Sequence, residues 1–209
     1  MGSLSLAHEP VTGIPHGKLG MWIFLATEIM FFSGFFATFI VMDAANPGLF
    51  EATAPALNWK LALTNTIILI GSSLTMALAI LNLERKDTGK FRMFLGLTLL
   101  GACGFLIIKT IEYSGKFSHG IGPDTNVFYA IYFLMTGFHG VHVVAGMIPM
   151  VWMLGKSFSK KGYTNAGRVE VLGLYWHFVD LVWIFLFPVF YLLYNPTLVW
   201  GAAAAAGGH

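Results

Sequence analysis

The sequence predicts an all-α membrane protein, a bundle of five transmembrane helices in a single domain over residues 1–195. Of its 209 residues, 56% are hydrophobic and only 11% are charged. With a mean hydropathy of +0.72, the chain is too apolar for a soluble domain of this length. Five apolar segments are each long enough to cross a bilayer, which takes about 20 residues. A net charge of +2 without a basic run argues against nucleic-acid binding.

The five spans are expected at Leu19–Met42, Lys60–Leu83, Phe91–Ser114, Val127–Leu154 and Val169–Tyr194. The segments between them carry turn formers and charges, as in "NLERKDTGK" and "GKSFSKKGYTNAGR". The first apolar run is too long for the apolar core of a signal peptide, so we expect it to be a retained span. Residues 196–209 form a low-complexity tail to which we assign no function.

The basic residues predict the orientation of the chain. If the spans alternate in direction, nine of them fall on one side of the membrane: Lys18, Arg85, Lys86, Lys90, Arg92, Lys156, Lys160, Lys161 and Arg168. The other side holds only Lys60 and Lys116. Because basic residues concentrate in cytoplasmic loops, we expect a cytoplasmic N-terminus and an external C-terminus.

Seven ionisable residues lie within the predicted spans, where an ionisable group is costly and points to function by default. They are Glu28, Lys109, Glu112, His139, His142, His177 and Asp180. Six of them form three pairs spaced three residues apart, so each pair shares one helix face. A shared face lets each pair be partly satisfied within its own helix.

Two of the pairs have structural and functional interpretations. Lys109 and Glu112 lie toward one end of their span, where a structural ion pair is the simpler interpretation. His177 and Asp180 fit a buried hydrogen-bonded pair that fixes helix packing. They equally fit an imidazole oriented by a carboxylate, in a proton path or next to a metal.

His139 and His142 resemble half of a metal site, but a metal site usually needs three or four ligands. Only His177 remains as a third intramembrane imidazole, so we predict no metal on this chain. The single cysteine, Cys103, is expected to be a small buried hydrophobic residue.

Glu28 has no basic residue within a turn of its own helix, and Phe24, Phe31, Phe32 and Phe35 surround it at helical spacing. Without a partner from another helix its carboxyl should be uncharged, because burial disfavours the charged form. Such a group exchanges protons or only donates a hydrogen bond, and both roles stay open. We expect it to contact His139 or His142, because these groups lack other intramembrane partners.

Small residues mark the expected packing faces of the third and fourth spans, because they allow close approach between helices. They are Gly96, Gly101, Gly104, Gly137, Gly140 and Gly146.

Four motifs follow one another along the chain, each on its own span: "ATEIMFFSGFF", "KTIEYSGKF", "TGFHGVHVVAGM" and "YWHFVDLVWIFLFPVFY". In this order they resemble subunit III of the haem–copper oxidases. The resemblance extends from about His16 to Tyr194, and "GFHGVHV" together with "YWHFVDLVW" is its most specific part.

The resemblance implies an accessory subunit of a cytochrome c oxidase, a complex that reduces oxygen and pumps protons in a bacterial inner membrane. The implied partners are the catalytic subunit I, subunit II, small subunits and phospholipids. Haem and copper are expected in the partner subunits and no cofactor on this chain, whose implied role is to sustain proton uptake and protect the catalytic site. Three intramembrane histidines in two clusters are too few to ligate haem and copper together.

The resemblance also implies identities for the buried acids and histidines. The acid of the "E-x-x-F-F" stretch is the family's carbodiimide-reactive glutamate and corresponds to Glu28. The acid of the "E-Y" pair corresponds to Glu112. The histidines of "FHGVHV" and the "WHFVD" pair correspond to the polar residues identified above on the last two spans. The resemblance implies no catalytic residue on this chain.

Many family members have seven helices, and this chain is similar to the shorter five-helix bacterial form. The lipid-filled cleft of the long form then needs a wall from another subunit or is missing. The quinol branch often carries Asp at the position of Glu28, so the glutamate favours the cytochrome c branch, with a quinol oxidase as the alternative.

A stand-alone proton channel or transporter is the competing class of function. Transporters often show internal repeats or helices broken near the midplane. No repeat is evident here, Pro188 lies toward the end of the last span, and Pro149 is expected near a helix end. These observations favour the accessory-subunit interpretation.

Overall fold

The computed structural model of the chain describes residues 16–159, 163 and 165–194. Five helices in it are long and apolar enough to cross a membrane. They are α1 (His16–Ala45), α3 (Trp59–Glu84), α4 (Thr88–Ser118), α5 (Val127–Ser157) and α6 (Ala166–Phe187), which continues into the π-helical η2 (Pro188–Leu192). The short helices α2 (Leu49–Thr53) and η1 (Ala54–Ala56) connect α1 to α3. The predicted all-α fold with five spans is confirmed; the tail, 196–209, lies outside the described residues.

Polar caps in the sequence set where four of the long helices begin. The side chains of Asn58, Asp87, Asn126 and Asn165 each accept a hydrogen bond from the backbone N–H three residues further on. Such caps satisfy an amide that the first helical turn leaves without a partner. The amide of Lys90 bonded in this way, together with its ammonium, holds the pKa of the Asp87 carboxyl below its usual range.

The helices extend beyond the predicted spans at several ends. α5 continues to Ser157, so Pro149 lies inside the helix, and the expectation of a position near its end was wrong. α6 ends where Pro188 begins a π-helical turn, in keeping with the missing N–H of proline.

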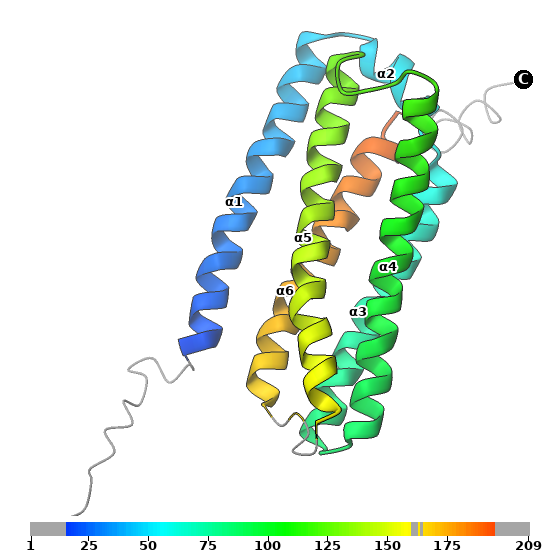
Figure 1. Ribbon diagram of the computed structural model, residues 1–209. Helices are drawn as coiled ribbons and strands as arrows, with labels where there is room; N and C mark the ends of the chain where they lie inside the picture. Colours follow the sequence, from blue (N-terminus) through cyan, green and yellow to red (C-terminus); the bar gives the residue numbers. More distant parts are fainter. Residues whose placement is uncertain (1–15, 160–162, 164, 195–209) are drawn as a thin grey trace, which may run out of the picture.

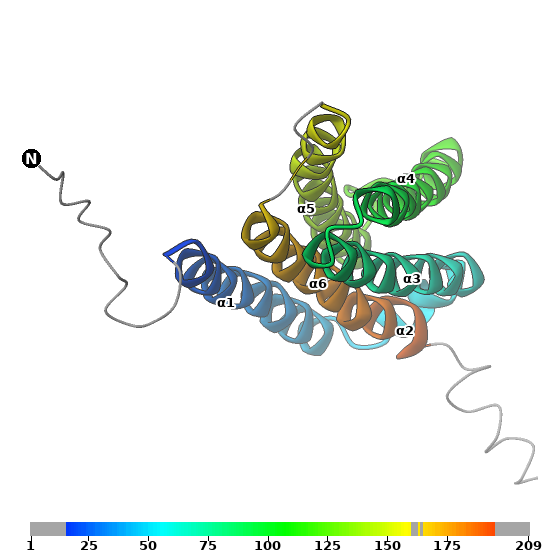
Figure 2. The same cartoon turned by 90° about the horizontal axis from the view of Figure 1, so that it is seen from below.

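Figure 1 shows the long helices running up and down beside one another, with α1 at one edge. Seen along the bundle, α6 lies between α1 and α3, while α4 and α5 lie on the other side (Figure 2). Contacts of α6 with α1, α3 and α5 agree with this arrangement. In the apolar, membrane-spanning stretch of α6 and η2, 61% of the residues are buried, against 17% in that of α1. α6 is therefore the central helix and α1 a peripheral one.

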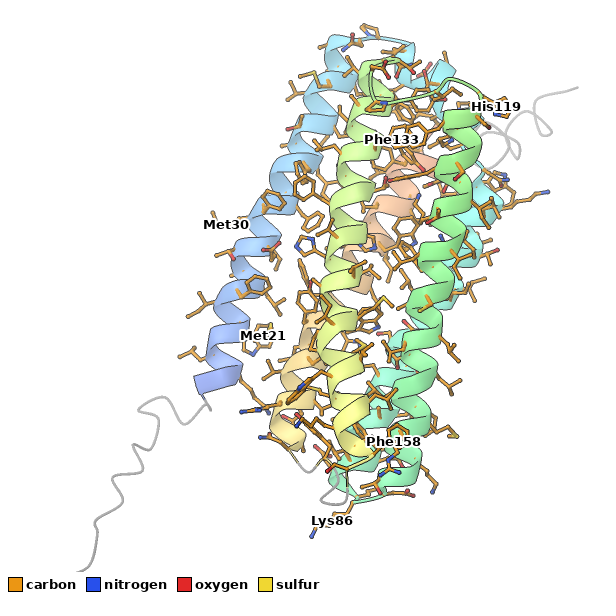
Figure 3. All side chains as sticks on the ribbon, in the orientation of Figure 1. Met21, Met30, Lys86, His119, Phe133 and Phe158 are labelled. Carbon is orange, nitrogen blue, oxygen red and sulfur yellow. The ribbon has the colours of Figure 1, made fainter. Side chains whose placement is uncertain are left out.

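The connections between helices alternate between the two ends of the bundle. Lys86 and Phe158 lie at the end where α1 begins, and His119 lies at the opposite end (Figure 3). This places Lys18, at the start of α1, at the same end as the α3–α4 and α5–α6 connections. Lys160 and Lys161 lie outside the described residues. Which end faces the cytoplasm stays a prediction.

Large aromatic side chains fill the interior of the bundle. Trp176 and Trp183 of α6 are fully buried, and their indole N–H groups donate to Ser72 Oγ at 3.1 Å and to Thr66 Oγ1 at 3.0 Å. Both acceptors lie on α3. A buried indole needs such a partner, so these two bonds fix how α6 faces α3.

The expected small-residue packing faces are present only in part. A Cβ at Gly101 would stand 2.9 Å from the Cβ of Ser72, and one at Gly146 would stand 3.0 Å from the ring of Trp176. Gly96, by contrast, has no neighbouring atom within 4 Å of such a Cβ, and the same holds for Gly137 and Gly140. Close helix approach thus requires glycine at positions 101 and 146.

Cys103 contradicts its expected burial. Its side chain is exposed on the outer surface of α4. Neighbouring Ala102, one residue earlier on the helix, takes the fully buried position instead. The expectation rested on the apolar composition around Cys103, which does not say on which face of the helix a residue lies.

We predict that Gly101→Ala destabilises the chain by about 1–2 kcal/mol, because the added methyl group overpacks the contact with α3. Thermal unfolding in mild detergent measures this effect. Gly96→Ala is the matched control and should leave stability unchanged or raise it, since alanine is the better helix former. Equal effects at both positions would contradict the packing described for α3 and α4.

Candidate functional site

Glu28 of α1 and His142 of α5 form the polar contact at the centre of the candidate site. Glu28 Oε2 lies 3.0 Å from His142 Nε2, so the contact between Glu28 and a histidine predicted from the sequence is present. On the other side of the ring, His142 Nδ1 lies 2.8 Å from the carbonyl oxygen of Phe138. A carbonyl only accepts hydrogen bonds, so Nδ1 must carry a proton.

This arrangement fixes the number of protons in the pair. With Nδ1 protonated, a neutral imidazole presents a lone pair at Nε2, and an ionised carboxylate presents lone pairs as well. Two lone pairs repel, so a hydrogen bond between them needs one proton. That proton lies on Glu28 or on His142, and the pair as a whole is neutral in both cases. A neutral pair avoids most of the cost of a lone charge in the membrane.

Aromatic rings shelter the pair. The ring of Phe32 meets His142 edge-on at 5.4 Å, and Phe31 and Phe35 lie 5.6 and 5.5 Å from Phe138. The side chains of the acid and the imidazole are still 17% and 16% exposed. The site is therefore apolar and sheltered, yet reachable from the outer surface of the bundle.

Three polar contacts along its length hold α1 to the rest of the bundle. Lys18 pairs with Glu170 of α6 near one end, and the Tyr194 hydroxyl donates to Asp43 at 2.5 Å near the other. The Glu28 contact lies between them. In Figure 3 Met30 lies on the outer side of α1, where it is 76% exposed. These polar contacts act together with buried apolar side chains of α1, among them Leu25, Phe32 and Phe39.

Lys109 and Glu112 lie in a separate buried network. Lys109 Nζ is 2.9 Å from Glu112 Oε2 and 3.0 Å from the hydroxyls of both Tyr132 and Tyr191. Both tyrosines donate in turn to Glu112 Oε1. The rings of Tyr113, Tyr132, Trp183 and Tyr191 surround the ammonium at 5.1–5.6 Å. All three ammonium protons have acceptors, which favours the structural interpretation of this pair.

His139 does not share the contact of His142. It is fully buried between the rings of Phe105 and Trp183, at 5.4 and 5.3 Å. Neither ring nitrogen has a hydrogen-bond partner among the described residues. In that same part of the chain, no three His, Cys, Asp or Glu side chains gather closely enough to hold a metal ion.

His177 and Asp180 do not form the direct contact that both sequence interpretations require. His177 Nδ1 lies 2.5 Å from Ser73 Oγ of α3. The oxygens of Asp180 have no hydrogen-bond partner within the described ranges, although the residue is only 4% exposed. The shared helix face brings the two side chains near one another, but the hydroxyl of another helix captures the imidazole.

Sequence reasoning missed several polar residues of these networks. Tyr132 and Tyr191 belong to the Lys109 network, and Ser73 binds His177. Their signal was present, because a hydroxyl inside an apolar span needs a partner. Which partner it finds depends on the rotation of one helix against another, and a single sequence does not fix that rotation.

The comparisons with known proteins cover the whole bundle. The family pattern described as cytochrome c oxidase subunit III matches residues 7–195. The chain belongs to the cytochrome c oxidase subunit III family. It is 37% identical over 180 residues to the cytochrome c oxidase subunit 3 of Corynebacterium diphtheriae, covering 84% of this chain and 87% of that protein. It is 32% identical over 178 residues to the subunit 3 of Bacillus sp. strain PS3, covering 84% of each.

As a member of the cytochrome c oxidase subunit III family, the chain is a multi-pass membrane protein and a subunit of an oxidoreductase complex. The matched residues include all five spans and the seven ionisable residues discussed above. The resemblance noted on four sequence motifs is confirmed over nearly the full length. Family membership implies that the chain has partner subunits.

Proposed function

We propose that this chain is an accessory, non-catalytic subunit of a proton-pumping cytochrome c oxidase. In this proposal it packs on the catalytic subunit I, next to subunit II and small subunits, in the inner membrane of a bacterium. Haem and copper belong to the partner subunits, and this chain holds neither. Support comes from the family match and from relatives named for cytochrome c oxidase rather than for a quinol oxidase.

The Glu28–His142 pair is the observation that supports a role for this chain beyond assembly of the complex. One proton in a neutral, sheltered pair can shift between the carboxyl and the imidazole without creating net charge in the membrane. We propose that the pair supports proton uptake by the catalytic subunit and so protects it from inactivation during turnover.

Phospholipid binding is the second part of the proposal. A hollow of about 620 Å³ lies between the start of α1 and the neighbouring ends of α5 and α6. Arg168 lines it together with the Lys18–Glu170 ion pair, beside apolar Met21, Met153 and Leu172. This combination suits an anionic headgroup with an acyl chain, because basic side chains at a membrane interface attract anionic lipids.

Purification of the tagged chain from its native membranes in mild detergent tests the proposed assembly. The expected eluate contains large multi-span partners and the optical bands of haem. A colourless eluate without partners, taken from membranes that contain intact oxidase, would contradict it. The haem type and any bound cytochrome c identify the branch of the oxidase family.

A further inference from the structure

A groove between α3 and α6 carries polar groups that the proposed function does not use. It is a hollow of about 330 Å³, and Ser73, His177 and Asp180 lie on its wall. Leu74, Leu181 and Ile184 also line it and are strongly exposed on the outer surface. The groove is thus apolar at its rim and polar inside.

Asp180 is the group that needs an explanation. It is 4% exposed, and neither carboxyl oxygen has a hydrogen-bond partner in the described part of the chain. The two other acids inside the bundle are satisfied, Glu28 by His142 and Glu112 by Lys109. A buried polar group without a partner is costly, and inside a membrane no bulk water offsets that cost. Among the residues that line the groove, Ser73 carries the only hydroxyl, and it lies 2.5 Å from His177 Nδ1 rather than forming a hydrogen bond with this acid.

The surface around α6 has the shape of a helix-docking site. A second hollow of about 280 Å³ lies between α1 and α6, and Leu181 lines both hollows. The outer face of α6 therefore has a hollow on each side, in the row α1–α6–α3 that Figure 2 shows. A neighbouring helix packs by fitting its rows of side chains between those of the surface it covers. Only the groove beside α3 offers a carboxyl group, so the two grooves differ chemically.

We infer that the α3–α6 groove receives a transmembrane helix of another subunit of the same oxidase, and that this helix donates a hydrogen bond to Asp180. The inference rests on the proposed assembly and adds the docking face. A lipid chain has no donor to offer. A lipid headgroup has one, but Asp180 lies in the middle part of α6, away from the headgroup region. A side chain of a neighbouring helix can supply a donor at the depth of Asp180, because polar side chains form hydrogen bonds between helices in membranes.

Site-specific photo-cross-linking in the assembled oxidase tests the docking face. A benzophenone amino acid is placed at Leu74 or Ile184 on the rim of the groove. Matched controls carry it at Ile107 of α4 and Ile148 of α5, which are also exposed on the outer surface. We expect products with another oxidase subunit from the two rim positions and none from the two controls. Products from the control positions alone, or from all four positions equally, overturn the inference.

Two variants test the role of the acid itself. Asp180→Leu should reduce retention of the chain in the complex during detergent washing about tenfold, the effect of losing one strong hydrogen bond. The isolated chain should unfold at an unchanged or higher temperature, because the variant removes an acid without a partner. Asn65→Leu is the control: both side-chain polar atoms of Asn65 are buried and lack partners among the described residues, but it does not line the groove. Retention should be normal in Asn65→Leu.

The results separate this inference from the proposed function. A haem-containing preparation that gives no rim cross-link leaves the assembly standing and overturns the docking face. If the isolated Asp180→Leu chain unfolds at a lower temperature but is retained normally in the complex, the acid acts within this chain. That result overturns the hydrogen bond to a partner subunit. A preparation without haem or partners overturns the proposed assembly and this inference together.

Discussion

Replacing Lys109 by methionine should destabilise the folded chain by about 3–5 kcal/mol, the usual cost of breaking a buried ion pair by removing one partner. The variant leaves Glu112 buried, with 4% of its side chain exposed, and without its cation. Tyr132 and Tyr191 still donate to the carboxylate but cannot neutralise it. Unfolding of the purified chain in detergent, by heat or by denaturant, measures the loss.

Two further variants show whether charge is the cause. The double variant Lys109→Met with Glu112→Gln should recover much of the lost stability, because it removes the buried carboxylate that has lost the Lys109 ammonium. Lys90→Met removes the cation of an exposed pair at the same spacing, with Asp87, and should change stability little. A double variant as unstable as Lys109→Met would show that the lysine acts through packing.

Glu28→Gln should abolish reaction of the chain with a hydrophobic carbodiimide, a reagent that attacks a protonated carboxyl in apolar surroundings. The glutamine amide still donates to His142 Nε2, so the link between α1 and α5 is kept. Glu28→Leu should abolish both the labelling and the link between α1 and α5. Leucine has no carboxyl group to react, and it leaves the imidazole without a partner. Labelling followed by peptide mass analysis reads out the first effect, and thermal stability in detergent reads out the second.

The expected stability loss for Glu28→Leu is about 1 kcal/mol, the typical worth of a polar contact between helices in a membrane. Glu112 serves as an internal control, because its buried and paired carboxylate should stay unlabelled in every variant. If Glu28→Gln loosens α1 as much as Glu28→Leu does, the hydrogen bond derived for the pair is wrong. Labelling at Glu112 instead of Glu28 would contradict the contrast between the two acids.

Much of the architecture could be predicted from local signals. Apolar runs gave the five spans, and capping residues such as Asn58 and Asn126 mark helix starts that fit them. The absence of a basic residue near Glu28 on its own helix predicted a contact with His139 or His142, and the contact is with His142. Each of these inferences depends on a residue's own surroundings in the sequence, and a single sequence contains that information.

The remaining features depend on how helices are rotated against one another. His177 binds Ser73 rather than Asp180 because α3 presents a hydroxyl at that level. The rotation of α4 against its neighbours turns Cys103 outward and Ala102 inward. The tyrosines that complete the Lys109 network come from α5 and η2, far along the chain. The sequence shows that these polar side chains need partners, but it does not show which residue of another helix lies opposite each of them.

Infrared difference spectroscopy of the assembled oxidase tests most directly whether Glu28 and His142 share an exchangeable proton. The spectra compare the oxidised and reduced complex, with native chain and with Glu28→Gln. We predict a carboxyl C=O band that changes during the redox cycle and is absent from the variant, whose assembly is intact. A spectrum unchanged by Glu28→Gln, from a complex that still contains this chain, would show that the pair only holds α1 in place.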